Sequence, residues 1–261
     1  MNSKKLKILL IILVVFLFVL NYSWLNRATE NFLDSGKYVR IDRVIDGDTV
    51  QVNGTSIRLL GINTPEHGER YFQEAKDFME NQVLNKTVRL EFGKEKQDRY
   101  GRTLAYIFLN GENINLKVVE MGLGNFYFPS GKDKYYDKFS SAWNSCANLA
   151  SENLCKKSDD ICSKCIVLEN FNSKDEIITL RNICNFSCDL TNWDIKDEGR
   201  KHFDFPSFVL NGGNEINILT GNGSDSKDTF YWKNQDYVWT ETGDTLFLRD
   251  SENGLVLWKS Y

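Results

Sequence analysis

The sequence has no excess of basic residues. Its 261 residues include 32 lysines and arginines against 36 aspartates and glutamates, so the formal net charge is −4. A chain of this charge has no global positive field to attract a polyanion. Any contact with nucleic acid must therefore come from a local cluster of cations rather than from the whole surface.

Histidine is scarce, and the first half of the chain has no cysteine. The two histidines, His67 and His202, lie far apart in the sequence and in different expected domains. Neither therefore indicates a metal cluster built on imidazole ligands.

The one long apolar run lies at the N-terminus. Three lysines at positions 4, 5 and 7 precede an unbroken apolar run over 8–20, and apolar residues continue to Leu25 with only Asn21 and Ser23 as strongly polar breaks. A run of this length can span a bilayer, and the preceding lysines favour the cytoplasmic side. We predict a single-pass membrane anchor over 1–25 and a polar stalk over 26–36, with the rest outside the cell membrane. The alternative is a secreted protein released by signal cleavage, although 22–32 has no A-x-A-like site.

An outward location favours disulfides for the cysteines, which are even in number. They are Cys146, Cys155, Cys162, Cys165, Cys184 and Cys188. The alternative is a four-thiolate zinc site formed by the last four, which would leave the first two without partners. About 15 disulfide pairings are possible, and the sequence does not choose among them.

Strand and helix periodicities alternate over 37–156. Asn53-Gly54 between two alternating runs predicts a tight hairpin. Expected strands cover 38–45, 49–52, 55–62, 86–92 and 102–109, and expected helices cover 69–84, 113–121 and 134–153. Five strands and three helices in this order predict an α+β domain, a small five-stranded OB-type barrel.

The C-terminal part has a different pattern. A polar, cysteine-bearing linker over 157–164 leads to 165–261, where we expect strands at 165–171, 176–182, 203–210, 215–219, 245–249 and 255–258. They are separated by Gly, Asn, Asp and Ser clusters, which predicts an all-β sandwich.

Two polar segments meet across the predicted hairpin. Pairing across Asn53-Gly54 brings Asp48 to within about one residue of a position opposite Arg58. The returning strand stops at Pro65, which cannot continue a ladder, and this turn adds oxygen ligands and a second carboxylate, Glu66.

A third segment, 98–102, is a turn that enters a strand. It contributes two guanidiniums and a phenol, from Arg99, Arg102 and Tyr100. Each segment alone has a plain explanation as a turn or a solvated surface group. Together they supply oxygen ligands for a hard cation, a carboxylate base and forked donors for phosphate, as phosphodiester hydrolysis requires.

The same segments carry a resemblance to a known family. Residues 45–49 (IDGDT), 58–66 (RLLGINTPE) and 98–106 (DRYGRTLAY) resemble, in order and spacing, the three signature segments of the staphylococcal nuclease, or thermonuclease, family. The likeness covers 38–154. It implies an OB-type barrel with three helices and an endonuclease that cleaves DNA and RNA with calcium, leaving 3′-phosphates.

The resemblance also implies roles for individual residues. It makes Glu66 the general base, and Arg58 and Arg102 the arginines that hold the phosphate and stabilise the transition state. Arg99 and Tyr100 match a lysine and a tyrosine that contact substrate. Tyr127 lies near family aromatics that pack against a base, although 125–129 does not align cleanly.

The expected calcium ligands are Asp48, the backbone carbonyl of Thr64, and Asn63. Asn63 stands where the family's best-known member has an aspartate. The site thus keeps an oxygen and loses a negative charge, which predicts weaker calcium binding.

Residues 176–182 (EIITLRN), 188–196 (CDLTNWDIK), 203–210 (FDFPSFVL) and 243–250 (GDTLFLRD) resemble segments of the lamin-tail family. The likeness covers 166–261 and implies an immunoglobulin-like sandwich with Trp193 and Phe205 in its core. Domains of this kind often accompany nucleases as binding or tethering modules, and the ligand here is unknown. A competing hypothesis is a catalytically silent barrel that acts with the sandwich as a nucleic-acid or surface-binding module. Degenerate barrels usually lose the arginines and the glutamate, whereas Arg58, Glu66 and Arg102 are all present.

Overall fold

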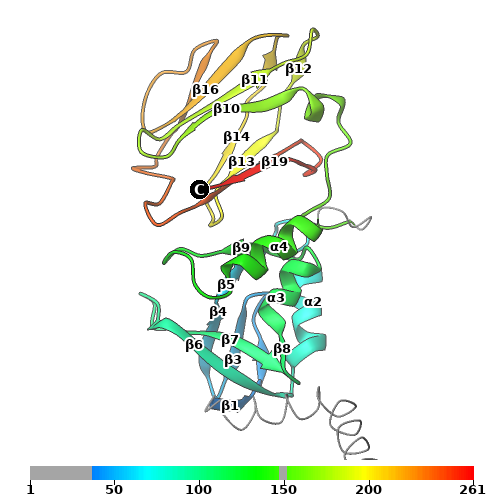
Figure 1. Ribbon diagram of the computed structural model, residues 1–261, viewed down its shortest axis with the longest axis vertical. Helices are drawn as coiled ribbons and strands as arrows, with labels where there is room; N and C mark the ends of the chain where they lie inside the picture. Colours follow the sequence, from blue (N-terminus) through cyan, green and yellow to red (C-terminus); the bar gives the residue numbers. More distant parts are fainter. Residues whose placement is uncertain (1–36, 147–151) are drawn as a thin grey trace, which may run out of the picture.

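A computed structural model describes residues 37–146 and 152–261. Figure 1 shows two bodies stacked along the long axis, a barrel with helices and an all-β domain. The predicted anchor over 1–25 and stalk over 26–36 lie outside the described residues. Within the described ranges, every helix is too short or too polar to cross a membrane.

The first domain is built on one strongly curved sheet, with strands in the order β1-β6-β7-β4-β3-β2 and β8 on β7. The strands are β1 (Lys37–Arg40), β2 (Arg43–Val44), β3 (Thr49–Val52), β4 (Thr55–Leu59), β6 (Thr87–Gln97), β7 (Thr103–Leu109) and β8 (Glu112–Asn113). Strands β1 and β2 are consecutive in the chain yet lie at the two ends of this order, so the sheet curls back on itself. Counted as one strand, they leave a five-stranded arrangement that fits the predicted OB-type barrel.

Two predicted strands are interrupted where the chain changes partner. The 38–45 strand breaks at Ile41 and Asp42, whose amides donate to Lys86 and Gln51 on opposite sides. The 55–62 strand breaks at Leu60, because Gly61 adopts a positive φ of 77° that few other residues tolerate. Beyond it, β5 (Gly61–Asn63) leaves the main sheet and pairs with β9 (Asn125–Tyr127).

All three predicted helices are present in the first domain: α2 (Phe72–Val83), α3 (Ile114–Glu120) and α4 (Tyr136–Cys146). Asn113 caps α3 by accepting from the amide of Leu116 at 3.1 Å. The expected end of the last helix at residue 153 is wrong. Residues 152 and 153 lie in bends rather than in a helix, and close to them a disulfide holds Cys146 and Cys155 with their Cα atoms 5.7 Å apart.

The second domain is mostly β, as predicted. One sheet has the order β10-β11-β16-β17, a second has the order β14-β13-β18-β19, and β12 pairs with β15. The strands are β10 (Ile166–Asn172), β11 (Ile177–Asn182), β12 (Cys188–Asp189), β13 (Asp194–Lys196), β14 (His202–Asp204), β15 (Val209–Leu210), β16 (Glu215–Thr220), β17 (Thr229–Trp232), β18 (Thr245–Arg249) and β19 (Leu255–Ser260). A short 3-10 helix, η1 (Ile161–Lys164), precedes β10. Trp193 and Phe205 are buried in the core, as expected.

One predicted strand of this domain is wrong. The run 203–210 is two strands, because β14 pairs with β13 and β15 pairs with β12, and the chain leaves the ladder at Pro206 between them. Strands β12, β13 and β17 were not predicted, since they are short and lack a clear alternation.

Disulfides pair all six cysteines. Cys146 joins Cys155, Cys162 joins Cys188, and Cys165 joins Cys184. The last two link the segment that enters the sandwich to a loop and a strand of that same domain. The structure therefore assigns the four cysteines of the alternative zinc site to covalent pairs.

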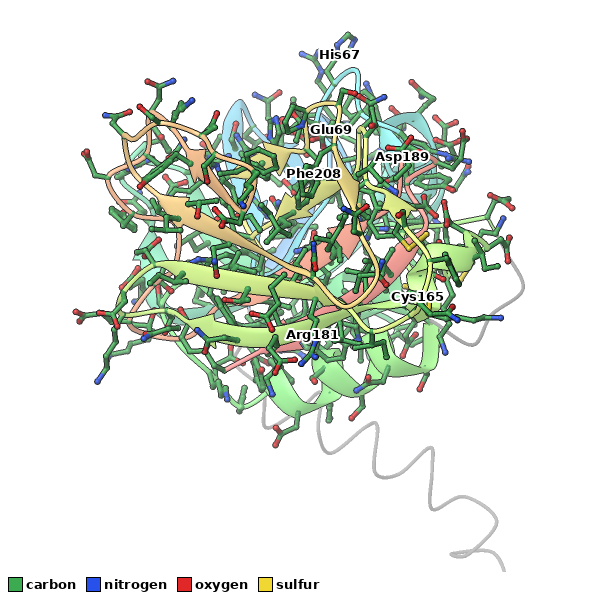
Figure 2. The ribbon with its side chains drawn as sticks, turned by 90° about the horizontal axis from the view of Figure 1, so that it is seen from above. His67, Glu69, Cys165, Arg181, Asp189 and Phe208 are labelled. Atoms are coloured by element: carbon green, nitrogen blue, oxygen red, sulfur yellow. A yellow bond between two sulfur atoms is a disulfide. The ribbon has the colours of Figure 1, made fainter. Side chains whose placement is uncertain are left out.

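The two domains share one apolar core. Phe126 and Trp143 of the first domain lie 6.4 and 5.2 Å from Phe247 of the second, measured between ring centroids. Trp258 lies 5.9 Å from Phe126 in an edge-on contact. In Figure 2, which looks down on the second domain, the loop with His67 and Glu69 lies on the side opposite the strand that carries Arg181. An aromatic interface of this kind fixes the relative position of the domains.

Candidate active site

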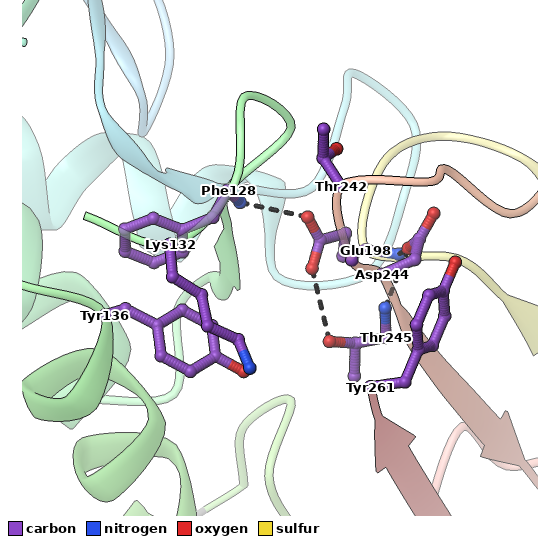
Figure 3. Close-up of a pocket in the computed structure, with 9 residues that line it drawn as sticks. Phe128, Lys132, Tyr136, Glu198, Thr242, Asp244, Thr245 and Tyr261 are labelled. Carbon is purple, nitrogen blue, oxygen red and sulfur yellow. Dashed lines mark hydrogen bonds between the residues drawn. The ribbon is translucent and has the colours of Figure 1, made fainter. Parts of the chain in front are cut away.

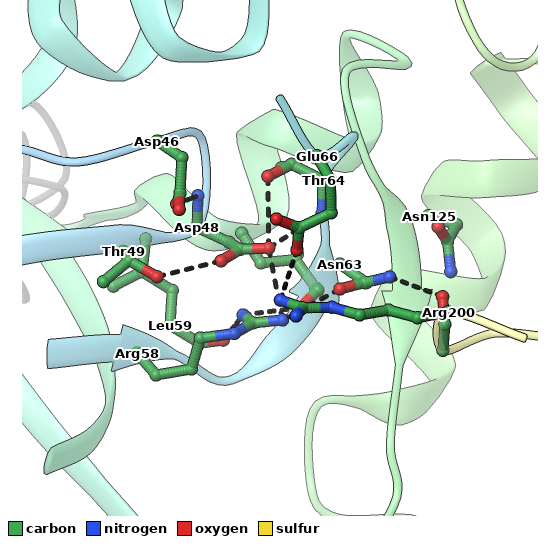
Figure 4. Close-up of polar contacts among 12 residues, drawn as sticks. Asp46, Asp48, Thr49, Arg58, Leu59, Asn63, Thr64, Glu66, Asn125 and Arg200 are labelled. Atoms are coloured by element: carbon green, nitrogen blue, oxygen red, sulfur yellow. Dashed lines mark hydrogen bonds and ion pairs between the residues drawn. The ribbon is translucent and has the colours of Figure 1, made fainter. Parts of the chain in front are cut away.

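The hairpin places a carboxylate beside a guanidinium, as the sequence predicts. Arg58 on β4 pairs with Thr49 on β3, and the amide of Leu59 donates to the carbonyl of Asp48 at 2.8 Å. Nη2 of Arg58 lies 3.1 Å from Oδ2 of Asp48. Both side chains are almost fully buried, so the ion pair is shielded from solvent and held in one geometry (Figure 4).

The turn after β5 lies against the same carboxylate. Oδ2 of Asp48 accepts hydrogen bonds from the amide of Thr64 at 2.9 Å and from its hydroxyl at 3.1 Å. The break at Gly61 turns β5 out of the sheet and so brings this segment back to the hairpin. The predicted ligand residues Asp48 and Thr64 are thus adjacent, and Glu66 follows two residues later.

The side chain of Asn63 has partners on both sides. Its Oδ1 accepts from Nη2 of Arg58 at 3.0 Å, while its Nδ2 donates to the carbonyl of Gly199 in the second domain at 2.7 Å. Arg58 also donates through Nη1 to the carbonyls of Leu59 and Ile62. Asn63 therefore couples a buried arginine of the site to the neighbouring domain.

Asp46 is a site residue that the sequence analysis did not assign. Its Oδ1 accepts from the amide of Asp48 at 3.0 Å. Burial, and then the negative charge of Asp48, raise the pKa of Asp46 to about 6. Two carboxylates two residues apart in one tight turn were a visible signal of such repulsion.

The third predicted segment joins the site through sheet register. Arg58 pairs with Leu104 on the parallel strand β7, and Arg102 directly precedes the first residue of that strand, Thr103. Nε of Arg102 donates to Oδ2 of Asp98 at 2.7 Å. Burial opposes ionisation of Asp98, but hydrogen bonds from Arg102 and Tyr100 outweigh it and lower the pKa of that carboxyl.

Three predicted substrate residues border these arginines. Tyr100 is 69% exposed, its hydroxyl accepts from Nη2 of Arg99 at 2.7 Å, and Arg102 lies over its ring at 5.5 Å. On the other side, the guanidinium of Arg58 lies 5.9 Å from the ring centre of Tyr127, where burial raises the pKa of the phenol. Exposed and half-buried aromatic faces therefore flank the cations, as base stacking requires.

Comparison with known proteins agrees with this geometry. Residues 56–154 match the model of the staphylococcal nuclease homologue family, and residues 157–261 match the Lamin Tail Domain. A thermonuclease of Staphylococcus hyicus is 34% identical over 155 residues, which cover 53% of this chain and 91% of that protein. The chain belongs to the staphylococcal nuclease family.

Other relatives of the nuclease domain are similar at the same level. A thermonuclease of Staphylococcus intermedius is 35% identical over 147 residues, covering 51% of this chain and 87% of that protein. Endonuclease YncB of Bacillus subtilis is 34% identical over 113 residues, covering 39% of this chain and 54% of that protein. The predicted order of a nuclease domain followed by a lamin-tail domain is confirmed.

The lamin-tail domain contributes a residue to this candidate site. Arg200 forms an ion pair with Glu66, and its side chain extends from the second domain into the first (Figure 4). Lys196 lies 3.3 Å from Glu69 on the same side. No local pattern around residue 200 signals this role, because the contact depends on how the two domains pack.

The oxygen donors around Asp48 fit the chemistry of a hard cation. Asp48, the amide oxygen of Asn63 and the carbonyl of Thr64 are the donor types that calcium prefers. Burial first, and then the charge of Asp48, raise the pKa of Asp46 beside these donors. Within residues 37–146 and 152–261, His, Cys, Asp and Glu side chains do not form a metal-binding group of three, so neutral oxygens would complete the shell.

Two cavities lie at the domain interface. The smaller, of about 10 Å³, has room for a single water beside Glu198, which accepts from the amide of Phe128 and the hydroxyl of Thr245 (Figure 3). The larger, of about 310 Å³, lies next to the active-site turn, between Pro65 and strand β13. Burial raises the pKa of Asp194 in this larger cavity to about 6. Only the larger one could admit part of a substrate.

Proposed function

We propose that this protein is a calcium-dependent endonuclease that hydrolyses phosphodiester bonds of DNA and RNA and leaves 3′-phosphates. The observation that carries the proposal is the convergence of Asp48, Arg58 and Glu66 from separate segments on one site. Relatives named thermonuclease and endonuclease support the general class of activity.

The burial and the partners of each site residue indicate its role in the reaction. Glu66 is 43% exposed at its side chain, so it can reach a water and accept its proton as the water attacks phosphorus. Arg58 is buried and held by carbonyls, which makes it a fixed positive charge for the phosphate oxygens. Arg102 pairs with Asp98 through Nε, and its two terminal nitrogens would bind phosphate in a forked manner.

Calcium, held by Asp48, Asn63 and Thr64, would polarise the phosphate and lower the pKa of the attacking water. Asp46 supports this set by holding the amide of Asp48 in place at 3.0 Å. Tyr100 and Tyr127 would stack on the flanking bases, and Arg99 would steady the adjacent phosphate through its position beside Tyr100.

The location of the enzyme is also a proposal. An N-terminal anchor would hold the nuclease outside the membrane, where calcium reaches the range of about 10⁻⁴ to 10⁻³ M in which extracellular modules work. Three disulfides fit an oxidising compartment. At that concentration, calcium would still occupy a site that has Asn63 in place of an aspartate.

Digestion of plasmid and single-stranded DNA and of RNA by the purified chain, with calcium and with a chelator, tests the proposal. We expect cleavage with calcium only, and 3′-phosphate ends by end-labelling. Binding of nucleic acid without any cleavage would contradict the proposal and favour the silent barrel that acts with the lamin-tail domain as a binding module.

A further inference from the structure

The turn over residues 197–201 joins β13 to β14 and is closed by two hydrogen bonds. The amide of Asp197 donates to the carbonyl of Lys201 at 3.0 Å, and the amide of Lys201 donates back to Oδ1 of Asp197 at 2.9 Å. These two bonds close a five-residue loop whose middle residues, Glu198, Gly199 and Arg200, face the nuclease domain.

Three hydrogen bonds fix this turn to the nuclease domain. The carbonyl of Gly199 accepts from Asn63 at 2.7 Å, and the carbonyl of Glu198 accepts from Nδ2 of Asn125 at 2.8 Å. The carboxyl of Glu198, which is 4% exposed, accepts from the amide of Phe128 at 3.0 Å. The backbone that carries Arg200 is therefore part of the wall of the nuclease site.

Arg200 differs from its anchors in that its side chain is open to solvent. The side chain is 60% exposed, and its partner Glu66 is 43% exposed. An ion pair of this kind is worth roughly 0–1 kcal/mol, so blocking the site in this way would slow the enzyme at most about fivefold. A closed state populated to 99% would need a far larger free-energy difference between the closed and open states. The ion pair between Arg200 and Glu66 is therefore too weak to inhibit the enzyme by blocking its site. Arg200 can readily leave Glu66 for another anionic partner.

We propose that Arg200 of the lamin-tail domain is a phosphate-binding residue of the nuclease site. This inference rests on the proposed function and extends it, because it makes the second domain part of the substrate site. On substrate binding, the guanidinium leaves Glu66 for a phosphate oxygen of the polynucleotide.

The exchange suits both partners. A guanidinium binds phosphate through two parallel hydrogen bonds, which is a stronger arrangement than an exposed pair with one carboxylate oxygen. Glu66 loses a cation as the substrate arrives, so its carboxylate becomes available to the attacking water in the same step. Arg58 supplies a buried positive charge and Arg200 an exposed one, so the phosphate would be held by Arg200 and attracted by both.

The test compares three variants of the full chain: Arg200→Ala, Arg200→Lys and Lys201→Ala. Lys201 is the matched control, since it carries the same charge on the same turn but donates to the carbonyl of Tyr237 within the second domain at 2.6 Å. Binding of a fluorescent single-stranded oligonucleotide is measured by anisotropy in chelator over a range of salt concentrations, so that no cleavage intervenes.

We expect Arg200→Ala to weaken binding about tenfold, the effect of one lost charge-assisted hydrogen bond. The slope of log K against log salt should fall by about 0.7, the value for one phosphate contact on a single strand. Arg200→Lys should restore the slope and part of the affinity, and Lys201→Ala should resemble the wild type. With calcium, kcat/KM should fall in parallel for Arg200→Ala.

Unchanged binding and salt slope in Arg200→Ala would overturn the inference. So would a faster rate, or a lower calcium requirement, because either would make Arg200 an inhibitor. If the wild type fails to cleave but Arg200→Ala still binds less tightly, the proposed function fails while the phosphate contact stands.

Discussion

Asn63 donates from Nδ2 to the carbonyl of Gly199 at 2.7 Å while its Oδ1 accepts from Arg58. A carboxylate at this position could serve Arg58 but could not donate to Gly199. The amide therefore has a structural reason that the sequence alone did not reveal: it joins Arg58, a buried arginine of the candidate site, to the lamin-tail domain.

The variant Asn63→Asp should separate the two roles of this residue. An added carboxylate should lower the calcium concentration for half-maximal activity by about tenfold, or ~1.4 kcal/mol. The lost bond to Gly199 should cost ~1–3 kcal/mol of unfolding free energy, which lowers Tm by several degrees. Calcium titrations and thermal melts measure the two effects. Superimposable titrations would show that Asn63 is not a ligand.

The variants Glu66→Gln and Arg102→Ala should each reduce the cleavage rate at least ~10²-fold, the scale of losing one acid-base or charge-stabilising group. Both side chains are partly exposed, so Tm should change little. Arg89→Ala is a matched control, because this arginine pairs with Glu91 on β6. Wild-type rates in either active-site variant would remove the proposed mechanism.

The domain interface should weaken as the pH rises. Burial and then Asp244 raise the pKa of Glu198 to about 8, and the same two causes raise the pKa of Asp197 to about 7. The folded state therefore binds more protons than the unfolded chain between about pH 4 and pH 8. Stability from these groups is fully present below the unfolded pKa and is lost as the pH rises through the folded pKa.

Melts at a series of pH values test this expectation. Tm should fall by roughly 4–8 °C between pH 5 and pH 8.5, equivalent to about 2 kcal/mol for a protein of this size. The variant Glu198→Gln can still accept from Phe128 but does not titrate, so its curve should be flatter and should lie above the wild type at high pH. A wild-type Tm that rises across this range would contradict the assignment.

The cysteines should be oxidised in protein recovered from its own compartment. Replacement of Cys146 and Cys155 by serine should cost about 2.5 kcal/mol, from the entropy of the closed loop. Mass spectrometry counts free thiols, and a metal assay tests for zinc. Six free thiols, or one bound zinc per chain, would reverse the structural assignment.

Most of the correctly predicted features follow from patterns of residues that are close together in the sequence. The Asn53-Gly54 turn fixed the register that brings Asp48 to Arg58, and helical spacing identified the buried face with Ala75, Met79 and Val83. Hairpins and helices are decided by residues close in sequence, so such features can be recognised without a structure.

Other features depend on contacts that no local window contains. Arg200 meets Glu66 across a separation of more than 130 residues, and Phe247 enters the same core as Phe126. The break at Gly61 could be predicted only in part. A glycine in an apolar run indicates an irregular strand, but it does not show that the strand changes partner there. Domain packing decides these positions.

The aromatic core shared by the domains bears on the order of synthesis. Phe126 and Trp143 leave the ribosome well before Phe247 and Trp258, which cover them in the finished fold. The nascent nuclease domain therefore carries an uncovered aromatic surface until strands β18 and β19 arrive. By the same order, Arg200 reaches Glu66 late. A chain that ended between the domains would leave this aromatic surface exposed to solvent, so the core of the nuclease domain is completed only when the second domain has been made.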